Sequence, residues 1–479
     1  MSKASLDCVG PLELDGATMR ARIDACMDRI AAHIESLPEQ DVGYDQDGAA
    51  KAQKLIESVP EQGTSLDDLL DIVFDRAVPE SFNTASHGYL AYIPGGGIFD
   101  ASLADLISNT INRYTGVWLA APLLVQLEAN AIRWLCEVMG FPHTAFGLIT
   151  SGGSMSNFTA IVSARRTRLP ENFLHGVIYT SDQAHYSIRK AALMAGFPEQ
   201  RVVAIESDDR YRLQVEALSR RITADRAAGL QPFFCVGSAG TVNTGAVDDL
   251  PGLAELCARE QLWLHIDAAY GGFFQLTARG KRRLAGIERA DSIALDPHKG
   301  LFLPYGTGVL LVRDGDRLRR AHQVNADYMP NLENDPELQR PDFCSLSPEL
   351  SRPYRGLRLW LVLRLHGLAV FRRYLDEKLD LAQYAAERIA AIPGIEMIVT
   401  PELSLFAFRL RKPACSIEQL NALNRELLDL VLARQRVWLS GTMLGGRFVL
   451  RICVLSFRTH RDRINAAIED IHAGVEALK

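Results

Sequence analysis

The sequence predicts an α/β fold, in which helices cover a mainly parallel sheet and a smaller C-terminal α/β unit follows. Between residues 86 and about 375, short apolar β-like runs alternate with helical stretches, the pattern of parallel strands joined by helical crossovers. A shorter alternation of the same kind occupies residues 376–479. The chain has 479 residues, enough for a large core and two or three domains.

Residues 1–85 are expected to form a helical arm. Apolar side chains recur at close to a 3.6-residue period between positions 19 and 37, at Ile23, Cys26, Met27, Ile30 and Ile34. A second helix is expected to open at residues 64–68, where a capping residue precedes two acids. Nothing in the arm suggests catalysis, so we interpret it as a packing or dimerisation arm.

The central segment, residues 86–375, supplies the predicted large sheet. Its strands are expected at Phe146–Thr150, Gly176–Thr180, Phe233–Gly237, Leu262–Ile266, Ser292–Leu295 and Gly308–Val312. Its helices are expected at Ser154–Arg168, Ile188–Ala195, Val215–Ala228, Leu250–Arg259 and Leu357–Phe371. Ligands of such folds bind beyond the carboxyl ends of the strands. Polar residues that directly follow a strand are therefore the candidates for a site.

The C-terminal segment, residues 376–479, is expected to form the smaller α/β unit. Its strands are expected at Ile395–Val399, Leu405–Arg409 and Phe448–Cys453. Its helices are expected at Ser416–Arg434 and His460–Ala477.

Composition excludes several classes of protein. The net charge is −6 and the isoelectric point is near 6.0, which argues against nucleic acid as a partner. Eight cysteines form no CxxC pair and no zinc-like spacing, as expected of a reduced, cytoplasmic protein without a metal. We expect no signal peptide and no membrane contact, because no uninterrupted apolar run reaches about 18 residues.

Lys299 and Asp267 each stand at the end of a predicted strand. Lys299 is one of nine lysines and closes the tetrapeptide DPHK after the strand at 292–295, while Asp267 follows the strand at 262–266. Such a pair suits pyridoxal 5'-phosphate (PLP), because the lysine holds the cofactor as a Schiff base and the acid keeps the ring nitrogen protonated. Taken separately, each has an ordinary alternative, an exposed loop lysine and a helix-capping aspartate.

The run TSGGSMSN at residues 150–157 lies where a predicted strand meets a helix. Its small residues, Gly153 among them, let backbone N–H groups approach an anion, and Ser154 adds a hydroxyl donor. The run predicts a phosphate cradle. A helix N-cap with a tight turn is the alternative.

Four further side chains follow predicted strands. His185 is placed to stack on a flat cofactor ring, although a lone histidine is more often structural. Asp296 and His298 flank the lysine, so His298 is expected near the phosphate or the substrate. Thr241 follows the strand at 233–237 and is expected to contact the ring or its substituents.

Taken in order, these motifs resemble those of the PLP-dependent group II amino-acid decarboxylases, which include the aromatic-L-amino-acid, histidine and glutamate decarboxylases. The matching segments are HGYLAYIP at 87–94, SGGS at 151–154, His185, HIDAAYGG at 265–272, DPHK at 296–299 and RPYRGLRLW at 352–360. The resemblance implies fold type I of the PLP-dependent transferases, with a mainly parallel seven-stranded sheet and helices on both faces. It also implies a homodimer with active sites at the subunit interface.

The resemblance also assigns roles by position. Lys299 is expected to form the Schiff base, with Asp267 at the ring nitrogen. The residues expected against the two ring faces and near the phosphate are His185, Ala269, Gly153, Ser154 and Asp296. Those expected to contact the substrate are Tyr92, Pro94 and Gly95, together with Tyr114 and Trp118 from the partner subunit.

The Pro-rich segment at 329–353 is long enough to be a functional loop. In aromatic decarboxylases a loop tyrosine is thought to return a proton to the substrate carbon after CO2 leaves. Counting back from Arg355 and Trp360, Phe343 takes its place here, and phenylalanine has no proton to donate. In the related aromatic aldehyde synthases, the same replacement accompanies oxidative deamination.

The main functional hypothesis is therefore decarboxylation of an aromatic or similarly bulky L-amino acid to the amine and CO2. The alternative is an aldehyde synthase reaction, favoured by Phe343. A PLP lyase for phosphorylated substrates is disfavoured because no membrane anchor is expected. A non-enzymatic PLP-binding protein is disfavoured because Lys299, Asp267 and His185 are all present.

Overall fold

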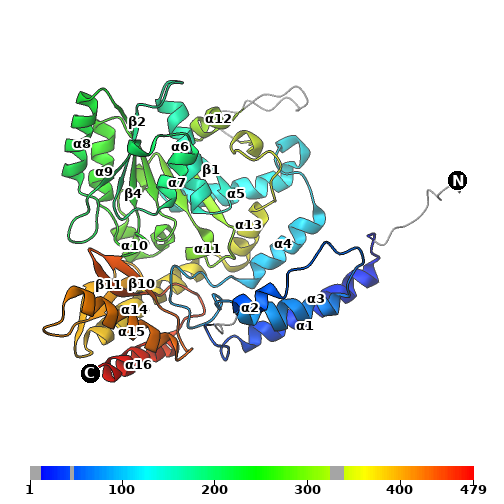
Figure 1. Cartoon of the computed structure of the whole chain (residues 1–479). Helices are drawn as coiled ribbons and strands as arrows, with labels where there is room; N and C mark the ends of the chain where they lie inside the picture. Colours follow the sequence, from blue (N-terminus) through cyan, green and yellow to red (C-terminus); the bar gives the residue numbers. More distant parts are fainter. Residues whose placement is uncertain (1–11, 44–47, 324–338) are drawn as a thin grey trace.

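The computed structural model describes residues 12–43, 48–323 and 339–479. Within these ranges the largest unit is built on a seven-stranded sheet of order β1-β7-β6-β5-β4-β2-β3 (Figure 1). Of these described strands, six run in one direction and β7 is antiparallel to both neighbours. The predicted fold class is confirmed. The strands are β1 (Phe146–Thr150), β2 (Gly176–Ser181), β3 (Val202–Ile205), β4 (Gln231–Ser238), β5 (Trp263–Asp267), β6 (Ser292–Leu295) and β7 (Gly308–Val312).

Helices pack against this sheet and bury its apolar strands. α6 (Gly153–Arg168) contacts most of the strands, because small residues such as Ala160 and Ala164 face the sheet. In the described ranges, no helix is both long enough and apolar enough to cross a membrane. The other helices of this unit are α4 (Phe99–Ile111), α5 (Pro122–Val138), α7 (Ser187–Met194), α8 (Val215–Ala227), α9 (Leu250–Arg259), α10 (Ala278–Arg283), α11 (Pro297–Gly300), α12 (Gly315–His322) and α13 (Gly356–His366).

Two sequence-based expectations for this unit were wrong. β3 was missed, because it is a short edge strand in which only Val203 and Ile205 are buried. The single helix expected at 357–371 is two helices, since α13 ends at His366 and α14 (Leu368–Ala390) follows Gly367. Gly367 has a φ of 69°, a left-handed conformation that ends a helix and that glycine adopts readily.

The C-terminal unit is a four-stranded antiparallel sheet of order β10-β11-β9-β8, packed against α14 and α15, and α16 packs on these two helices. β10 was not predicted, because most of its residues are only partly buried and carry no alternating pattern. α14 runs continuously through positions 375 and 376, so the expected division falls inside a helix; the three-part division stays a prediction. The remaining elements are β8 (Ile395–Val399), β9 (Leu405–Leu410), α15 (Ile417–Leu432), β10 (Ser440–Leu444), β11 (Arg447–Cys453) and α16 (Arg461–Ala477).

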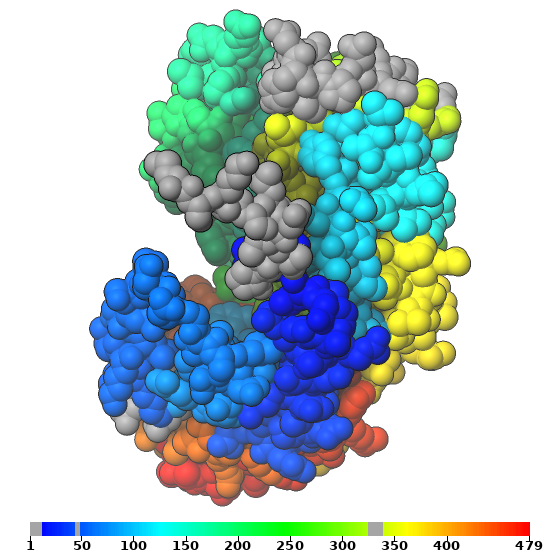
Figure 2. All heavy atoms as spheres, turned by 90° about the vertical axis from the view of Figure 1, so that its right-hand side faces the viewer, coloured from blue at the N-terminus to red at the C-terminus, as the bar shows by residue number. Residues whose placement is uncertain are grey.

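The described part of the N-terminal arm consists of helices joined by non-helical segments at 37–43 and 54–65. The Asp15 carboxylate caps its first helix by accepting from the backbone N–H of Thr18 at 2.7 Å, and Ser65 caps its third. No residue of the first helix is buried in the single chain. Figure 2 shows the arm in blue on the same face as α4 and α5 in cyan. The arm consists of α1 (Gly16–Ser36), α2 (Gly48–Gln53), α3 (Leu66–Asp71), a π-helical turn (Ile72–Ala77) and a 3-10 turn (Val78–Glu80).

Candidate active site

A cavity of about 360 Å³ opens at the edge of the large sheet where its parallel strands end. This volume is within the usual range for a small-molecule site. Its lining includes one residue at or just after each of five strands: Ser154 (β1), His185 (β2), Thr241 (β4), Asp267 (β5) and Lys299 (β6). Carboxyl ends of parallel strands share one edge, so side chains distant in sequence meet here, as predicted.

Lys299 lies on the single turn α11, directly after β6. Its Nζ atom is 2.9 Å from Oδ2 of Asp296, three residues earlier. Asp296 is 3% exposed, and its Oδ1 atom has no hydrogen-bond partner among the described residues. The lysine side chain remains 23% exposed. A buried carboxylate thus positions an amine that is open to the cavity, where a carbonyl compound can react with it.

Asp267 ends β5 with both carboxylate oxygens acting as acceptors. Oδ1 accepts from the backbone N–H of Ala269 at 3.2 Å. Oδ2 accepts from the side-chain amide of Asn157 on α6 at 3.1 Å. These two donors come from different elements and fix the orientation of the carboxylate that lines the cavity.

His185 lines the cavity just before α7. Its Nδ1 atom lies 2.7 Å from the hydroxyl of Ser187. Burial lowers the pKa of His185 below its ordinary value, and the negative charge of Asp267 opposes part of that shift. The imidazole is therefore mainly neutral at neutral pH, carrying a proton on one nitrogen.

The start of α6 forms the floor of the cavity beside Lys299. Gly152 has a φ of 153° and leaves the helix start without a side-chain cap. A Cβ atom on Gly153 would lie 3.2 Å from both Ala269 Cβ and Asp296 Oδ2, so only glycine leaves this surface open. The N-terminus of a 16-residue helix attracts negative charge, which suits a phosphate.

His298 and Thr241 complete the predicted set around the cavity. Nδ1 of His298 donates to the backbone oxygen of Thr307 at 2.7 Å, and burial lowers the pKa of this histidine. The Thr241 hydroxyl is buried and lies 2.6 Å from that of Thr244.

The residues present fit PLP. The Lys299 amine suits the cofactor's aldehyde, the Asp267 carboxylate suits its ring nitrogen, and the open helix start at Gly153 suits its phosphate. His185 and Ala269 also line the same cavity, as stacking partners for a flat ring would. The side chains that suit each part of the cofactor therefore already line one cavity.

Five residues expected to contact the substrate do not line this cavity in the described part of the chain: Tyr92, Pro94, Gly95, Tyr114 and Trp118. Tyr92 is 58% exposed and Tyr114 is 40% exposed. Gly95 packs directly on the lysine turn, because a Cβ there would collide with the backbone oxygen of His298.

Phe343 lies in the protein core and not in the cavity. It is fully buried, and its ring stacks on Phe146 of β1 with centroids 6.2 Å apart. The guanidinium of Arg352 lies 4.6 Å from the ring centre and pairs with Glu128, itself buried. In the single chain Phe343 does not line the cavity, and its expected substrate contact stays a prediction. Residues 329–338, the first part of the predicted loop at 329–353, lie outside the described residues.

Sequence reasoning missed three buried polar residues beside the site. Asn157, Ser187 and His265 are each at most 2% exposed and are hydrogen-bonded to one another or to the predicted residues. The signal that could have pointed to them is a polar side chain at a position of a helix or strand that faces the sheet. The hydrogen-bond partners of these three residues lie on other elements, and the sequence does not show which elements are neighbours.

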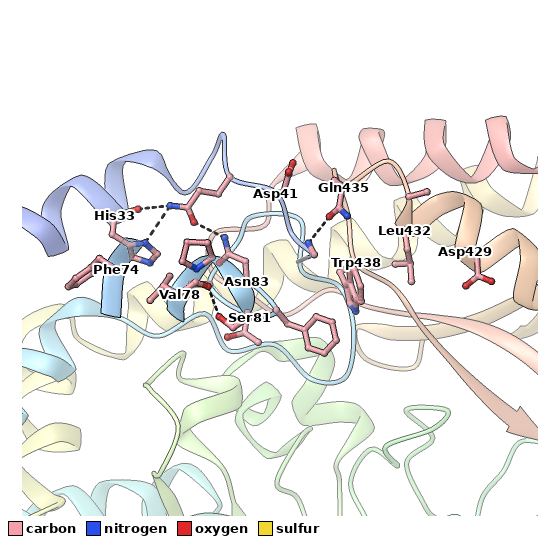
Figure 3. Close-up of a pocket in the computed structure, with 17 residues that line it drawn as sticks. His33, Asp41, Phe74, Val78, Ser81, Asn83, Asp429, Leu432, Gln435 and Trp438 are labelled. Carbon is pink, nitrogen blue, oxygen red and sulfur yellow. Dashed lines mark hydrogen bonds between the residues drawn. The ribbon is translucent and has the colours of Figure 1, made fainter. Parts of the chain in front are cut away.

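A second and larger cavity, of about 1330 Å³, lies between the N-terminal arm and the C-terminal unit. Figure 3 shows its arm side, with His33 and Phe74, and its C-terminal side, with Gln435 and Trp438. The backbone N–H of Gly43 donates to Oε1 of Gln435 at 2.9 Å across this junction. None of the predicted site residues lines this larger cavity.

The sequence matches known proteins along nearly its whole length. It matches the pyridoxal-dependent decarboxylase conserved domain over residues 50–411. It is 34% identical to an aromatic-L-amino-acid decarboxylase of Bacillus atrophaeus, covering 98% of this chain and 97% of that protein. It is 30% identical to a phenylacetaldehyde synthase of Arabidopsis thaliana, covering 86% of each.

Solved structures are similar over the same extent. A crystal structure of Oryza sativa TDC with PLP and tryptamine matches with a TM-score of 0.92 at 26% identity, covering 98% of this chain and 100% of that chain. A crystal structure of Catharanthus roseus tryptophan decarboxylase in complex with L-tryptophan matches with a TM-score of 0.89 at 26% identity, covering 97% and 99%.

Proposed function

Because the chain belongs to the pyridoxal-dependent decarboxylase family and is a PLP-dependent carboxy-lyase, we propose that it converts an aromatic L-amino acid to the corresponding amine and CO2. The observation that carries the proposal is the meeting of Lys299, Asp267 and His185 in one cavity. The aromatic substrate class is supported by the 34% identical aromatic-L-amino-acid decarboxylase and by the similar tryptophan decarboxylase structure.

The predicted residues would hold the cofactor at three points. Lys299 would bind its aldehyde covalently, Asp267 would pair with its ring nitrogen, and Gly153 with Ser154 would receive its phosphate at the start of α6. His185 and Ala269 would lie against the two ring faces. When bound, the cofactor supplies a protonated ring that accepts the electrons of the breaking bond to the carboxylate.

The chain's own groups would then do three things. Asp267 would stabilise positive charge at the ring nitrogen, through a carboxylate already oriented by Asn157 and Ala269. Buried walls such as Ile93 and Tyr270 would keep water from the substrate carboxylate, which favours loss of neutral CO2. His185, mainly neutral, would hold a proton inside the cavity.

The product assay decides the proposal. Purified protein loaded with PLP would be supplied with single L-amino acids, and CO2, amine, ammonia and peroxide would be measured together. We expect CO2 and amine in equal amounts from an aromatic substrate. Release of no CO2 from any aromatic amino acid would contradict the aromatic assignment, while release from another amino acid would redirect it.

The aldehyde synthase reaction is a second candidate, and one relative supports it. The Arabidopsis phenylacetaldehyde synthase is 30% identical to this chain. Phe343 gives the aldehyde synthase reaction little structural support, because this side chain is buried against Phe146. Aldehyde, ammonia and peroxide in place of amine would establish the aldehyde route.

We also propose a homodimer, with Tyr114 and Trp118 contributing to the partner's site. The single chain leaves apolar side chains exposed on α4, namely Leu103, Leu106, Ile107 and Ile111, and on α1, namely Met19 and Ile23. The arm and α4 lie on one face in Figure 2. Exposed apolar side chains that gather on one face are typical of a protein–protein interface. A second copy of the chain would cover it.

A further inference from the structure

A row of buried hydrogen bonds runs behind the site and reaches two of its functional groups. It links Trp263, Ser292, His265, Asn157 and Ser187, which are each at most 2% exposed. These residues come from β5, β6, α6 and α7, so the row joins the elements whose ends form the cavity. It ends at Asp267, the last residue of β5, and at His185, in the turn just before α7.

One end of the row is compatible with a single direction of its hydrogen bonds, which the other end fixes. The indole Nε1–H of Trp263 can only donate, so Ser292 Oγ accepts from it at 2.8 Å. The Ser292 hydroxyl proton is then free to point to Nδ1 of His265, also at 2.8 Å. Burial lowers the pKa of His265 to about 4, so this ring is neutral at neutral pH. When Ser292 donates to Nδ1, the single proton of this ring is on Nε2.

The other end imposes the same direction independently. The carboxylate of Asp267 can only accept, so Asn157 presents its amide nitrogen to Oδ2 at 3.1 Å. The carbonyl oxygen of Asn157 must then face Nε2 of His265, at 2.9 Å, and that nitrogen must donate. A flipped Asn157 would place two acceptor oxygens together at Asp267. The donor-only end and the acceptor-only end therefore agree on one arrangement.

A branch of the row reaches His185. The same amide nitrogen of Asn157 donates to Ser187 Oγ at 3.0 Å. The Ser187 hydroxyl proton is then directed to Nδ1 of His185 at 2.7 Å, and the Ser187 backbone N–H is directed to the same atom at 3.3 Å. Nδ1 of His185 is thus an acceptor, and the neutral ring carries its proton on Nε2.

We propose that Asn157 is a positioning residue that sets two groups of the site at once. It holds the Asp267 carboxylate in place for the ring nitrogen of the cofactor, and through Ser187 it keeps the proton of His185 on Nε2. His265 supports this role by fixing the orientation of the Asn157 amide. The inference rests on the PLP site proposed above, but its measurements do not require turnover.

Asn157→Leu tests the proposal, because leucine keeps the γ-branched shape of asparagine and has no hydrogen-bonding group. We expect the dissociation constant of PLP for the full-length chain, followed by fluorescence quenching, to rise about tenfold or more, as for loss of a hydrogen bond to a charged group. We also expect the 15N shifts of the His185 ring in the PLP-loaded protein to change from an Nε2–H form to a mixture of tautomers. The 15N signals of the His185 ring would be identified as those that disappear in His185→Gln.

Asn424 provides a matched control. It is also fully buried and makes three hydrogen bonds, but to Leu410 and Leu420 in the C-terminal unit. Asn424→Leu should lower stability and leave both the PLP dissociation constant and the His185 tautomer unchanged. Equal effects of Asn424→Leu and Asn157→Leu on PLP binding would overturn the proposal, since burial alone would then explain them.

A pair of variants at His265 keeps the test decisive if Asn157→Leu does not fold. His265→Gln retains an amide N–H near the position of Nε2, whereas His265→Leu does not. We expect His265→Gln to bind PLP nearly as the wild type does and His265→Leu to bind about tenfold more weakly. Indistinguishable binding by the two variants would overturn the proposal. Failure of the wild-type protein to bind PLP would instead overturn the cofactor site itself.

Discussion

Nζ of Lys299 lies 2.9 Å from Oδ2 of Asp296, on the turn of chain that follows β6. The partner is buried while the lysine remains partly open to the cavity, so the amine is oriented before any ligand arrives. Only one oxygen of Asp296 is used, and Oδ1 has no hydrogen-bond partner among the described residues. This preorganisation lowers the entropy lost on binding, since the reactive group does not have to be ordered at that moment.

Lys299→Ala should abolish turnover. We expect a loss of more than about a thousandfold in kcat, because no other lysine lines the cavity as described. The visible absorbance of covalently held PLP should disappear as well. The control is Lys281→Ala, which removes an exposed lysine on α10 and should change neither measurement. An active Lys299→Ala protein would show that the assignment is wrong.

Asp267→Asn should lower kcat by about a hundredfold or more while PLP stays covalently bound. The amide keeps the shape of the side chain but removes the charge that stabilises the protonated ring nitrogen. The matched control is Asp225→Asn, another buried carboxylate, which accepts from Tyr179 at 2.8 Å away from the cavity. Steady-state kinetics and absorbance spectra of both variants are the measurements. Wild-type kcat in Asp267→Asn would contradict the role.

Phe343→Tyr should leave the ratio of amine to aldehyde unchanged. The new hydroxyl would be buried beside Phe146, so we expect the free energy of unfolding to fall by about 1–3 kcal/mol. Product analysis and urea unfolding of the same preparation separate the two effects. A shift in products with unchanged stability would give position 343 the chemical role that the sequence suggested.

His322→Gln should flatten the acid side of the stability profile. Burial, followed by the charge of Arg166, lowers the pKa of His322 to about 4. Below its ordinary pKa of about 6.5 the unfolded chain takes up a proton that the folded protein excludes down to about pH 4, so stability falls as pH falls through that window. As pH falls from 7.5 to 5, His322 should lower the unfolding free energy of the wild type by roughly 2 kcal/mol. This contribution should be absent from His322→Gln. Urea unfolding at both pH values tests this. An equal change in unfolding free energy between pH 7.5 and 5 for the two proteins would refute it.

Leu106→Glu should weaken the proposed dimer. Leu106 on α4 is 50% exposed in the single chain and would be buried against a second copy, where a carboxylate has no partner. Sedimentation velocity should give twice the 53.0 kDa chain mass for the wild type and a lower mass for the variant. Leu174→Glu is the matched control, because Leu174 is also 50% exposed but lies away from α4, just before β2. A monomeric wild-type protein would contradict the dimer.

Part of the fold was predictable because several of its strands are buried from end to end. β1, β6 and β7 begin and end at the predicted residues, since each is a short apolar run with every residue buried. β3 and β10 escaped prediction because partly exposed strands carry no such run. The cytoplasmic location stays a prediction.

The site was predictable where single residues follow strands. Lys299, Asp267, His185 and Gly153 were found because strand ends of a parallel sheet converge. Asn157 and His265 were not singled out, because their importance comes from a hydrogen bond between positions 108 residues apart. The role of Phe343 stays a prediction, because counting along the chain gives a position in a sequence and does not show that the side chain is buried in the single chain.

Asn157 also bears on how the site comes into being during synthesis. Its partners His265 and Asp267 leave the ribosome about a hundred residues after it, and Lys299 emerges later still. A nascent chain that ends before β5 has the start of α6 but neither the ring-nitrogen acid nor the lysine. Cofactor capture therefore has to wait until β6 has been made and has joined the sheet, which places it near the completion of the large unit.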